Sequence, residues 1–517
     1  MRIFKRTLSM LLVLSFLFTF CVSALAANYD AGSFADMQTA FADSSGEDVS
    51  INVTDNILFD YALLGKEGIT YTIGTENGSE LHNAMFGGAG TVEVETDLAG
   101  SRGLEVSGDV TVNVTGDIDT YGSGVMAYGD AVVTVEGDIV AGGDGVEAYE
   151  NAAVTVTGDI ESTGADGVYA NGNTAVTVVG DIIGWDDGVY AGENAAVTVE
   201  GDVQAAYGVH AGGEATVSIT GDVAGEYYGI AVSDKASVTV NGNVSGMDGD
   251  SDALDPSDPY DYSDGGVGIY ADEDSTVEVT GDVTGGVGYG PEGWGGDAVS
   301  AQGNSSVTVN GDAIGGDGDY SAGDGVDMDS TATVRIGGDV IGGDAASDEY
   351  RTSGNGVTIE FEDPDEDDAL GSLIVVGSAI GGSEGNDLEL DNDSDLPLSE
   401  LVLPPINIGS YDSVDFDDFT DEEENALLSY LNGGRVGGVD LFWPGVAQQL
   451  RAAEKGAEIT VDAGARTTMP TYILALAAER EITLIIRWNG GEDIVVKEAV
   501  DVEGSIIRFE KLAELVK

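Results

Sequence analysis

The segment VTVTGDI at residues 154–160 decides the fold, because close variants of it recur along the chain. The pattern returns as VTVEGDI at 133–139, VTVVGDI at 176–182, VTVEGDV at 197–203 and VSITGDV at 217–223. The Gly-Asp pairs of these segments lie 20 to 22 residues apart. Self-similarity at such a fixed period is typical of architectures in which each repeat is one structural unit.

Valine and threonine alternate within each repeat at the two-residue period of a β-strand. The apolar side chains therefore share one face, and glycine marks the tight corner that follows. A second short element, DGVYAN at 166–171 and DGVYAG at 187–192, lies between the Gly-Asp pairs. One repeat cannot bury its apolar face alone, so repeats must stack about 4.8 Å apart. The sequence predicts an all-β parallel β-helix, a solenoid of about 21 residues and three strands per coil.

The start of the predicted solenoid carries helix signals. Ser33 followed by Asp36 is a capping-box signature. Phe34, Met37 and Phe41 would then share one face of a helix. Because an open first coil presents unpaired strand groups, a cover is needed there. We therefore expect a short N-terminal capping helix over the first coil.

The sequence changes character after Pro404-Pro405. Thr420 and Glu423 form a capping box ahead of ALLSYL at 426–431, and Trp443-Pro444 opens a second helix signal. Farther on, three elements are expected, namely strand EITVDAG at 458–464, a helix from Pro470 to Glu479, and strand ITLIIRW at 482–488. A strand, a helix and a strand in this order predict a small C-terminal α/β domain with a parallel pair.

The first residues are typical of a secretory signal peptide. Arg2, Lys5 and Arg6 precede an apolar run at 8–20, and Ala24-Leu25-Ala26 supplies the small-residue cleavage pattern. The mature chain would have no integral membrane span, and the one cysteine of the sequence lies inside this segment. The expected organisation is a signal peptide at 1–26, the cap and first coils at 27–100, repeats with acidic loop insertions at 101–390, a linker at 391–408 and the α/β module at 409–517.

The amino-acid composition excludes some classes of binding partner. The formal net charge is −77, which repels nucleic acid and anionic membrane surfaces. Hydrophobic residues make up 42% of the chain, which argues against disorder. We expect a secreted or cell-surface location, with extracellular glycans or cell-surface proteins as partners.

The repeats, from about residue 28 to 390, resemble the right-handed parallel β-helix proteins of the pectate-lyase-like superfold. The resemblance is to the form of this fold seen in adhesin-like surface proteins of Gram-positive bacteria. The resemblance implies a fold more than a function, because the shared motifs are turn and strand residues. Lyases of this fold use a Lys or Arg base beside calcium, as the resemblance implies. Lysine and arginine are rare in the repeats, and Lys235, Arg335 and Arg351 have no evident partner set, so no catalytic residue is assigned.

The aspartates of the Gly-Asp pairs form the first candidate site. Consecutive members should lie one coil apart, where like charges repel by about 1 kcal/mol in water. Backbone N–H groups of each aspartate's own turn would offset this repulsion, and Asn243 in the same position favours that interpretation. The alternative is structural calcium between neighbouring carboxylates. No cofactor is required, and the candidate calcium ligands are Asp138, Asp159, Asp181, Asp202 and Asp222.

A second candidate is the column of residues two positions after the glycine of the second element. It comprises Glu147, Tyr169, Tyr190 and His210. Aromatic rings in register can form a strip that binds sugar rings, or can simply stabilise the stacked coils. Both interpretations stay open at this point.

The sequence favours a secreted or cell-surface scaffold that binds glycans or other surface partners without catalysis. A carbohydrate-active enzyme, either a polysaccharide lyase or a glycoside hydrolase, is the alternative. Its site would lie under the insertions at 247–265 and 286–296, with Tyr289 and Trp294 as sugar-facing residues. A purely structural protein of an extracellular matrix or coat is the third interpretation.

Overall fold

The computed structural model describes residues 26–391 except 44, 76, 252–261, 347–351, 362–370 and 384, and residues 404–417 except 412. Beyond these it describes 427, 431, 435–436, 439–440, 446, 450, 455–464, 468–470, 472–488, 493–497, 500 and 506–516. The predicted signal peptide up to residue 25, most of the predicted linker, and most of the helix signals at 420–431 and 443–455 lie outside the described residues. The chain divides into two compact units, 1–159 and 160–517, described in turn.

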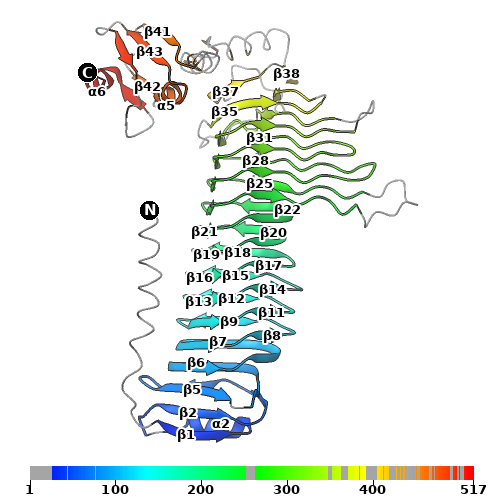
Figure 1. Ribbon diagram of the computed structural model, residues 1–517, viewed down its shortest axis with the longest axis vertical. Helices are drawn as coiled ribbons and strands as arrows, with labels where there is room; N and C mark the ends of the chain where they lie inside the picture. Colours follow the sequence, from blue (N-terminus) through cyan, green and yellow to red (C-terminus); the bar gives the residue numbers. More distant parts are fainter. Residues whose placement is uncertain are drawn as a thin grey trace. The chain divides into compact units, whose positions relative to one another are not determined.

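The first unit stacks parallel strands into coils (Figure 1). Its strands are β1 (Ala27–Ala31), β2 (Val49–Val53), β3 (Ile57–Leu58), β4 (Leu63–Gly65), β5 (Thr70–Thr75), β6 (Leu81–Glu95), β7 (Leu98–Thr115), β8 (Ile118–Thr120), β9 (Val125–Gly129), β10 (Val132–Glu136), β11 (Ile139–Ala141), β12 (Val146–Glu150) and β13 (Ala153–Thr157). On one face β1, β2, β5, β6, β7, β10 and β13 pair in that order, all in parallel.

Helix α2 (Phe34–Phe41) covers the interior of the first coils, as the sequence predicts. Ser33 is its N-cap, and the Ser33 Oγ atom accepts the Asp36 N–H at 3.4 Å. Met37 and Phe41 are buried, and the Phe41 ring stacks on Tyr71 with centroids 4.1 Å apart. The helix thus supplies apolar surface where no earlier coil is present among the described residues.

The second unit repeats three faces per coil, each built from parallel strands. The first face carries β16 (Ala175–Val179), β19 (Ala196–Glu200), β21 (Thr216–Ile219), β23 (Ser237–Val240), β26 (Thr276–Val279), β29 (Ser306–Val309), β32 (Thr333–Ile336), β35 (Ser372–Ile380) and β37 (Ile406–Ser410). The second carries β14 (Ile160–Ser162), β17 (Ile182–Ile183), the start of β20 (Val203–Ala211) and of β22 (Val223–Val232), β24 (Val244–Gly246), β27 (Val283–Thr284), β30 (Ala313–Ile314) and β33 (Val340–Ile341). The third carries β15 (Val168–Gly172), β18 (Asp187–Glu193), the ends of β20 and β22, β25 (Val267–Ala271), β28 (Val299–Ala301), β31 (Val326–Asp329), β34 (Val357–Glu360), β36 (Leu388–Asp391) and β38 (Val414–Asp417).

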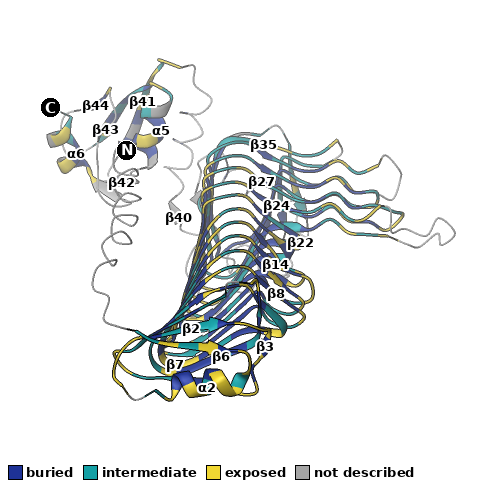
Figure 2. Cartoon of the chain, turned by 60° about the horizontal axis from the view of Figure 1, so that its bottom comes forward, coloured by how far each residue is buried: buried dark blue, intermediate teal, exposed yellow. Residues whose placement is uncertain are grey.

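Alternation within each strand separates a dry interior from a wet surface. Val197 and Val199 of β19 are buried, whereas Thr198 between them is exposed. Figure 2 shows this burial in the stacked strands. Glycine is required at the corner, because a Cβ on Gly201 would lie 2.1 Å from the Gly180 carbonyl oxygen of the previous coil. The predicted parallel β-helix fold is confirmed.

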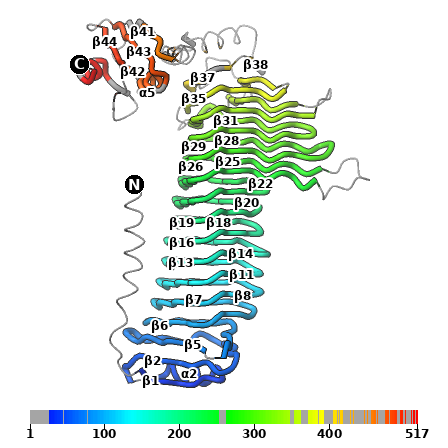
Figure 3. Tube along the Cα trace, viewed as in Figure 1, coloured from blue at the N-terminus to red at the C-terminus, as the bar shows by residue number. Residues whose placement is uncertain are grey.

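The described parts of the insertions in the later coils pair with one another through main-chain hydrogen bonds. Figure 3 shows their outgoing and returning legs side by side in successive coils. We call residues 246–249, 262–266, 285–297, 315–325, 342–346, 352–356, 381–383 and 385–387 the glycine-packed extension. Backbone hydrogen bonds cross it from glycine to glycine, through Gly266, Gly286, Gly296, Gly316, Gly323, Gly343, Gly354 and Gly382.

Only glycine permits this packing. A Cβ on Gly316 would lie 1.9 Å from the Gly286 carbonyl oxygen, and one on Gly296 would lie 1.9 Å from the Gly266 oxygen. Neighbouring legs are therefore joined mainly by main-chain hydrogen bonds, to which aspartate carboxylates such as that of Asp264 add. Gly296 N–H, for example, donates to Gly286 O at 2.9 Å, and Gly316 N–H donates to Gly296 O at 2.8 Å.

The coils continue beyond the boundary expected at residue 390. Strand β37 pairs with β35, and β38 pairs with β36, both in parallel, so the solenoid reaches Asp417. The acidic, proline-containing sequence around β37 and β38 does not predict these strands, because each strand has few apolar residues in alternation.

The C-terminal module contains the predicted α/β arrangement. Strand β41 (Glu458–Gly464) pairs in parallel with β43 (Thr483–Trp488), and α5 (Tyr472–Glu479) lies between them in sequence. The other elements are β39 (Arg435–Val436), β40 (Val439–Asp440), β42 (Thr468–Pro470), β44 (Ile494–Val496), β45 (Ile506–Arg508) and α6 (Phe509–Leu515). An apolar core that includes Ile473, Leu484 and Phe509 holds this module together.

Candidate functional site

The aspartates of the Gly-Asp pairs form a ladder that joins successive coils. In the second unit, Asp202 N–H donates to Asp181 Oδ1 at 2.8 Å, and Asp222 N–H donates to Asp202 Oδ1 at 2.8 Å. In the first unit, Asp159 N–H donates to Asp138 Oδ1 at 2.9 Å. Each carboxylate thus accepts a main-chain N–H, as predicted. The donor, however, belongs to the next coil and not to the aspartate's own turn.

Asparagine can replace aspartate in this ladder. Asn243 Oδ1 accepts the Asp282 N–H at 3.0 Å, and Asn243 N–H donates to Asp222 Oδ1 at 2.7 Å. The ladder therefore needs an acceptor oxygen and no charge. In the described part of the chain, no three His, Cys, Asp or Glu side chains are arranged to hold a metal ion. Calcium at the ladder stays a prediction that rests on the second carboxylate oxygens.

The predicted aromatic column is in register over three coils of the second unit. Tyr169 pairs with Tyr190, and Tyr190 pairs with His210. The two tyrosine rings stack with centroids 4.8 Å apart and planes 6° apart, and His210 meets Tyr190 edge-on at 5.2 Å. Each of these rings is partly buried.

Glu147, the fourth residue of the predicted column, belongs to the first unit. It is in register with Met126, and its carboxylate accepts hydrogen bonds from Ser123 Oγ and from the Tyr149 hydroxyl. Its carboxylate is therefore already engaged by neighbouring side chains within that unit.

Further tyrosines extend the column in ways that the spacing did not reveal. Tyr207 contacts His210 at 5.9 Å and Tyr228 at 5.7 Å, and Tyr228 contacts Tyr270 at 5.6 Å between ring centroids. Tyr207 and Tyr228 occupy a neighbouring register position, three residues before that of His210. A search for recurring tyrosines at a second fixed offset could have found them.

Stacking changes what this strip can do. A ring that lies face to face with the next ring cannot offer the same face to a sugar. Burial raises the pKa of Tyr190 and of Tyr207, and neighbouring tyrosines and aspartates raise it further. The rings of the aromatic column therefore present their edges and hydroxyl groups to the solvent. This geometry favours a role in stabilising the contact between successive coils.

His210 has an acidic neighbour in this strip. Its Nδ1 atom lies 3.5 Å from Asp187 Oδ2, and this hydrogen bond raises the pKa of His210 although burial opposes the shift. Asp187 is only 7% exposed, and its Oδ1 atom has no donor. The pair links the coils of β18 and β20.

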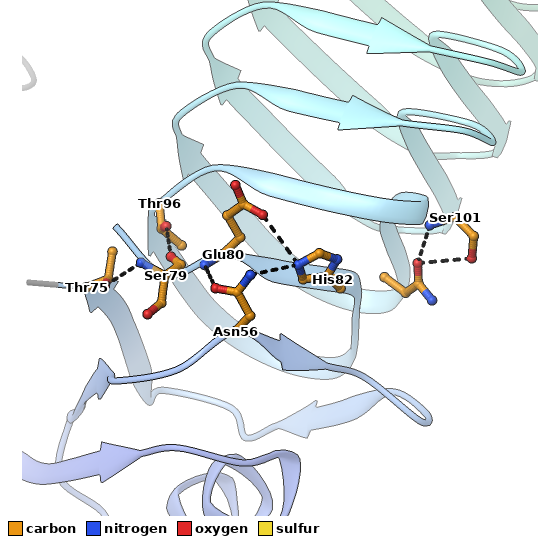
Figure 4. Close-up of polar contacts among 8 residues, drawn as sticks. Asn56, Thr75, Ser79, Glu80, His82, Thr96 and Ser101 are labelled. Atoms are coloured by element: carbon orange, nitrogen blue, oxygen red, sulfur yellow. Dashed lines mark hydrogen bonds and ion pairs between the residues drawn. The ribbon is translucent and has the colours of Figure 1, made fainter. Parts of the chain in front are cut away.

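The other histidine, His82, lies in the first unit (Figure 4). Its Nε2 atom is 3.3 Å from Asn56 Nδ2 and 3.4 Å from Glu80 Oε2. Glu80 N–H in turn donates to Asn56 Oδ1 at 3.1 Å. The group is a polar link between β3 and β6.

The glycine-packed extension carries the most exposed aromatic pair of the second unit's later coils. Trp294 is 55% exposed and Tyr320 is 38% exposed, and their ring centroids are 5.9 Å apart with planes 32° apart. Trp294 N–H donates to Asp264 Oδ1 at 2.9 Å, which fixes the tryptophan backbone. Tyr289, predicted beside Trp294, is half-buried and exchanges two backbone hydrogen bonds with Ser263.

Tyr320 was missed by the sequence reasoning, because it belongs to a different insertion from Trp294. The backbone bridge between Trp294 and Ser321 brings the two insertions into register. A tyrosine or tryptophan near the middle of consecutive insertions is the signal that could have found this pair.

A group of partly buried carboxylates lies where the extension meets the third face. Asp327 follows Tyr270 and Ser300 in register, so the aromatic column becomes acidic in the later coils. Burial raises the pKa of Asp327 to about 9, and the nearby carboxylates of Asp297 and Glu360 add to the shift. This raised pKa favours the protonated form of Asp327 at neutral pH.

Two neighbours of Asp327 are also shifted. Burial raises the pKa of Asp297 to about 6, and burial together with Asp297 raises that of Asp324 to about 7. Asp324 N–H donates to Asp297 Oδ1 at 2.6 Å, and Asp324 Oδ1 accepts the Asn355 N–H at 2.6 Å. No motif distinguishes these aspartates in so acidic a sequence.

Comparison with protein families, with curated proteins and with solved structures found no match to this chain. Among the described residues no helix has the length and apolar character needed to cross a membrane. Function must therefore be inferred from the positions of the chain's own residues.

Proposed function

We propose that this protein is an exported, adhesin-like β-solenoid that binds extracellular glycans without catalysis, through Trp294 and Tyr320 of the glycine-packed extension. The exposed pair of tilted rings is the observation that carries this proposal. Sugar rings bind aromatic faces through their apolar C–H groups, and exposed tryptophan and tyrosine supply such faces. The column of Tyr169, Tyr190 and His210 offers less, because the Tyr169 and Tyr190 faces contact each other and His210 lies edge-on to Tyr190.

Rigid support favours the extension as a binding surface. Asp264 Oδ1 accepts the Trp294 N–H, and Asp319 Oδ2 of the following insertion accepts the Gly290 N–H at 2.8 Å. Preorganised side chains lose less conformational entropy on binding. The net charge of −77 favours neutral or cationic glycans over anionic ones.

Binding measured on the mature chain tests this proposal. A panel of neutral, acidic and amino-containing polysaccharides is scored by calorimetry for the wild type and for Trp294→Ala/Tyr320→Ala. We expect about tenfold weaker binding in the double variant. Tyr121→Ala is the matched control, because Tyr121 is 90% exposed and lies in the first unit. Equal binding by the wild type and the double variant would contradict the proposal.

A carbohydrate-active enzyme is the second candidate, and Asp327 is the observation that favours it. A carboxyl group that stays protonated near neutral pH can act as a general acid, and Asp297 and Asp324 supply ionisable neighbours. The same polysaccharide panel, analysed for released fragments, tests it. Cleavage by the wild type that is lost in Asp327→Asn would establish the enzyme, whereas neither binding nor cleavage would favour a structural matrix protein.

A further inference from the structure

We infer that the first coils carry a separate groove that binds an uncharged saccharide unit, lined by Asn28, Asp30, Asn52, Gly74 and Glu95. This inference rests on the proposed function for its ligand class, because both name a glycan as the ligand. Its residues, however, lie in the first unit, far along the sequence from Trp294. No part of the groove belongs to the aspartate ladder or to the aromatic strip.

The groove follows the outer face of β1, β2, β5 and β6. Its volume is about 440 Å³, within the range of about 300–1,000 Å³ that is common for small-molecule sites. One lining row contains Asn28, Ser50 and Thr72 in register. The next row runs in register through Asp30, Asn52, Gly74 and Glu95.

Gly74 creates the hollow in the second row. A Cβ at this position would meet only side-chain atoms of Glu95, the nearest being Oε2 at 3.5 Å. The Glu95 side chain thus leans over the place that the Gly74 side chain would fill. Glu93, two residues earlier, does not line the groove, and its Oε1 atom accepts a hydrogen bond from Asn113 Nδ2 at 2.9 Å.

The lining side chains suit hydroxyl groups. The carboxylates of Asp30 and Glu95 can accept hydrogen bonds from sugar hydroxyls, and the asparagine amides can also donate. Asn52 Nδ2 donates to Asp30 Oδ1 at 3.1 Å, which fixes both side chains across two coils. The groove has no lysine or arginine among its lining residues, so it does not favour anionic sugars.

A metal ion is the other ligand that carboxylates suggest. Asp30 and Glu95 are the only carboxylates that line the groove, and the described residues contain no group of three metal-ligating side chains. Calcium takes six to eight oxygen ligands, so two separated carboxylates make a poor site for it. A hydroxyl-rich neutral ligand fits the mixed amide and carboxylate lining better.

The test uses the mature chain with Trp294→Ala/Tyr320→Ala, so that only the groove remains. Binding of neutral tetrasaccharides is followed by ligand-observed NMR, with and without Gly74→Val, which fills the hollow. We expect the residual binding to weaken about tenfold in Gly74→Val and in Asp30→Ala. Gly212→Val is the control, because a Cβ at Gly212 meets only side-chain atoms at 3.5 Å and beyond.

The outcomes separate the two proposals. Residual binding that Gly74→Val and Asp30→Ala leave unchanged would overturn the groove, even if the Trp294 and Tyr320 substitutions weaken binding to the parent chain. Loss of binding on Gly74→Val, together with no effect of the Trp294 and Tyr320 substitutions, would overturn the extension and keep the groove. Asp30→Ala serves where Gly74→Val fails to fold, since Asp30 is exposed. Calcium and the polyamine spermidine are tested as cationic ligands in the same way. Binding of either cation to the groove without binding of the neutral tetrasaccharides would also contradict the inference.

Discussion

At the scale of single residues, each ladder aspartate acts as an acceptor for the next coil. Asp202 Oδ1 receives the Asp222 N–H at 2.8 Å, and Asn243 performs the same role two coils later along the ladder. We predict that Asp202→Ala lowers the free energy of unfolding by about 0.5–1.5 kcal/mol, because it removes the acceptor of an exposed main-chain hydrogen bond. Asp202→Asn should stay within about 0.5 kcal/mol of the wild type.

Thermal and denaturant unfolding of the three proteins measures this effect. Hydrogen exchange at the Asp222 amide localises it, which matters because repeat arrays do not always unfold in two states. If Asp202→Ala and Asp202→Asn lost equal stability, the carboxylate's charge and not its acceptor role would be responsible.

The partly buried carboxyl of Asp327 predicts a pH dependence of stability. Its pKa in the folded chain, about 9, lies above the ordinary value of 3.8, so the folded state binds the proton more tightly. The resulting stabilisation is complete below about pH 4 and is lost as the pH rises toward 9. Asp327→Asn, which stays neutral, should melt at a higher temperature than the wild type at pH 8. The two proteins should converge near pH 4.

Melting temperatures of both proteins from pH 4 to 9 check this prediction, with Asp202→Asn as the control for removing one charge. A difference between wild type and Asp327→Asn that does not change with pH would show that Asp327 is not protonated in the folded chain.

The sequence could predict the ladder's residue types but not the donor. The same Gly-Asp pair appears in the sequence whether the aspartate accepts a hydrogen bond from an N–H of its own turn or from an N–H of the next coil. The choice depends on how Gly201 and Gly180 approach each other, which is a property of stacking. The raised pKa of Asp327 depends in the same way on neighbours from other coils.

At the scale of structural elements, the glycine-packed extension should tolerate no side chain between its legs. We predict that Gly316→Ala costs about 1–3 kcal/mol, because its Cβ would lie 1.9 Å from a main-chain oxygen that cannot move freely. Faster hydrogen exchange across 285–325 and weaker glycan binding at Trp294 should accompany the loss.

Gly212→Ala is the matched control, because ordinary contacts at 3.5 Å surround its added methyl group. Equal effects of the two substitutions would mean that glycine's conformational freedom, and not close packing, explains its use in the extension.

Some structural elements can be predicted from the sequence and others cannot. Strands such as β19 were predictable, because Val197 and Val199 alternate with threonine at the strand period. The α2 cap was predictable from Ser33 and its apolar face. The extension was not, because glycine legs have no side-chain periodicity and resemble loops. The pairing of Trp294 with Tyr320 depends on that unpredicted register.

At the scale of the whole molecule, self-repulsion of a chain with net charge −77 should destabilise the compact state. We predict that raising the NaCl concentration from about 0.01 M to about 1 M raises the melting temperature, because the screening length falls from about 30 Å to about 3 Å. Differential scanning calorimetry measures the shift.

Calcium chloride at matched ionic strength separates screening from specific binding. A further rise with calcium that EDTA reverses would support calcium at the ladder aspartates, whereas identical curves would leave screening as the sole effect. A melting temperature that is flat or falls with NaCl would contradict the electrostatic prediction itself.

The ladder has a consequence for how such a gene can change. Every coil from β16 to β23 presents the same acceptor oxygen to its successor and the same amide to its predecessor. Loss of residues 203–222 would bring the Asn243 amide opposite Asp202 Oδ1 and restore the same bond. In-frame duplication or deletion of one repeat therefore preserves the interface on both sides. Length becomes a heritable trait that recombination between near-identical repeats can adjust one coil at a time.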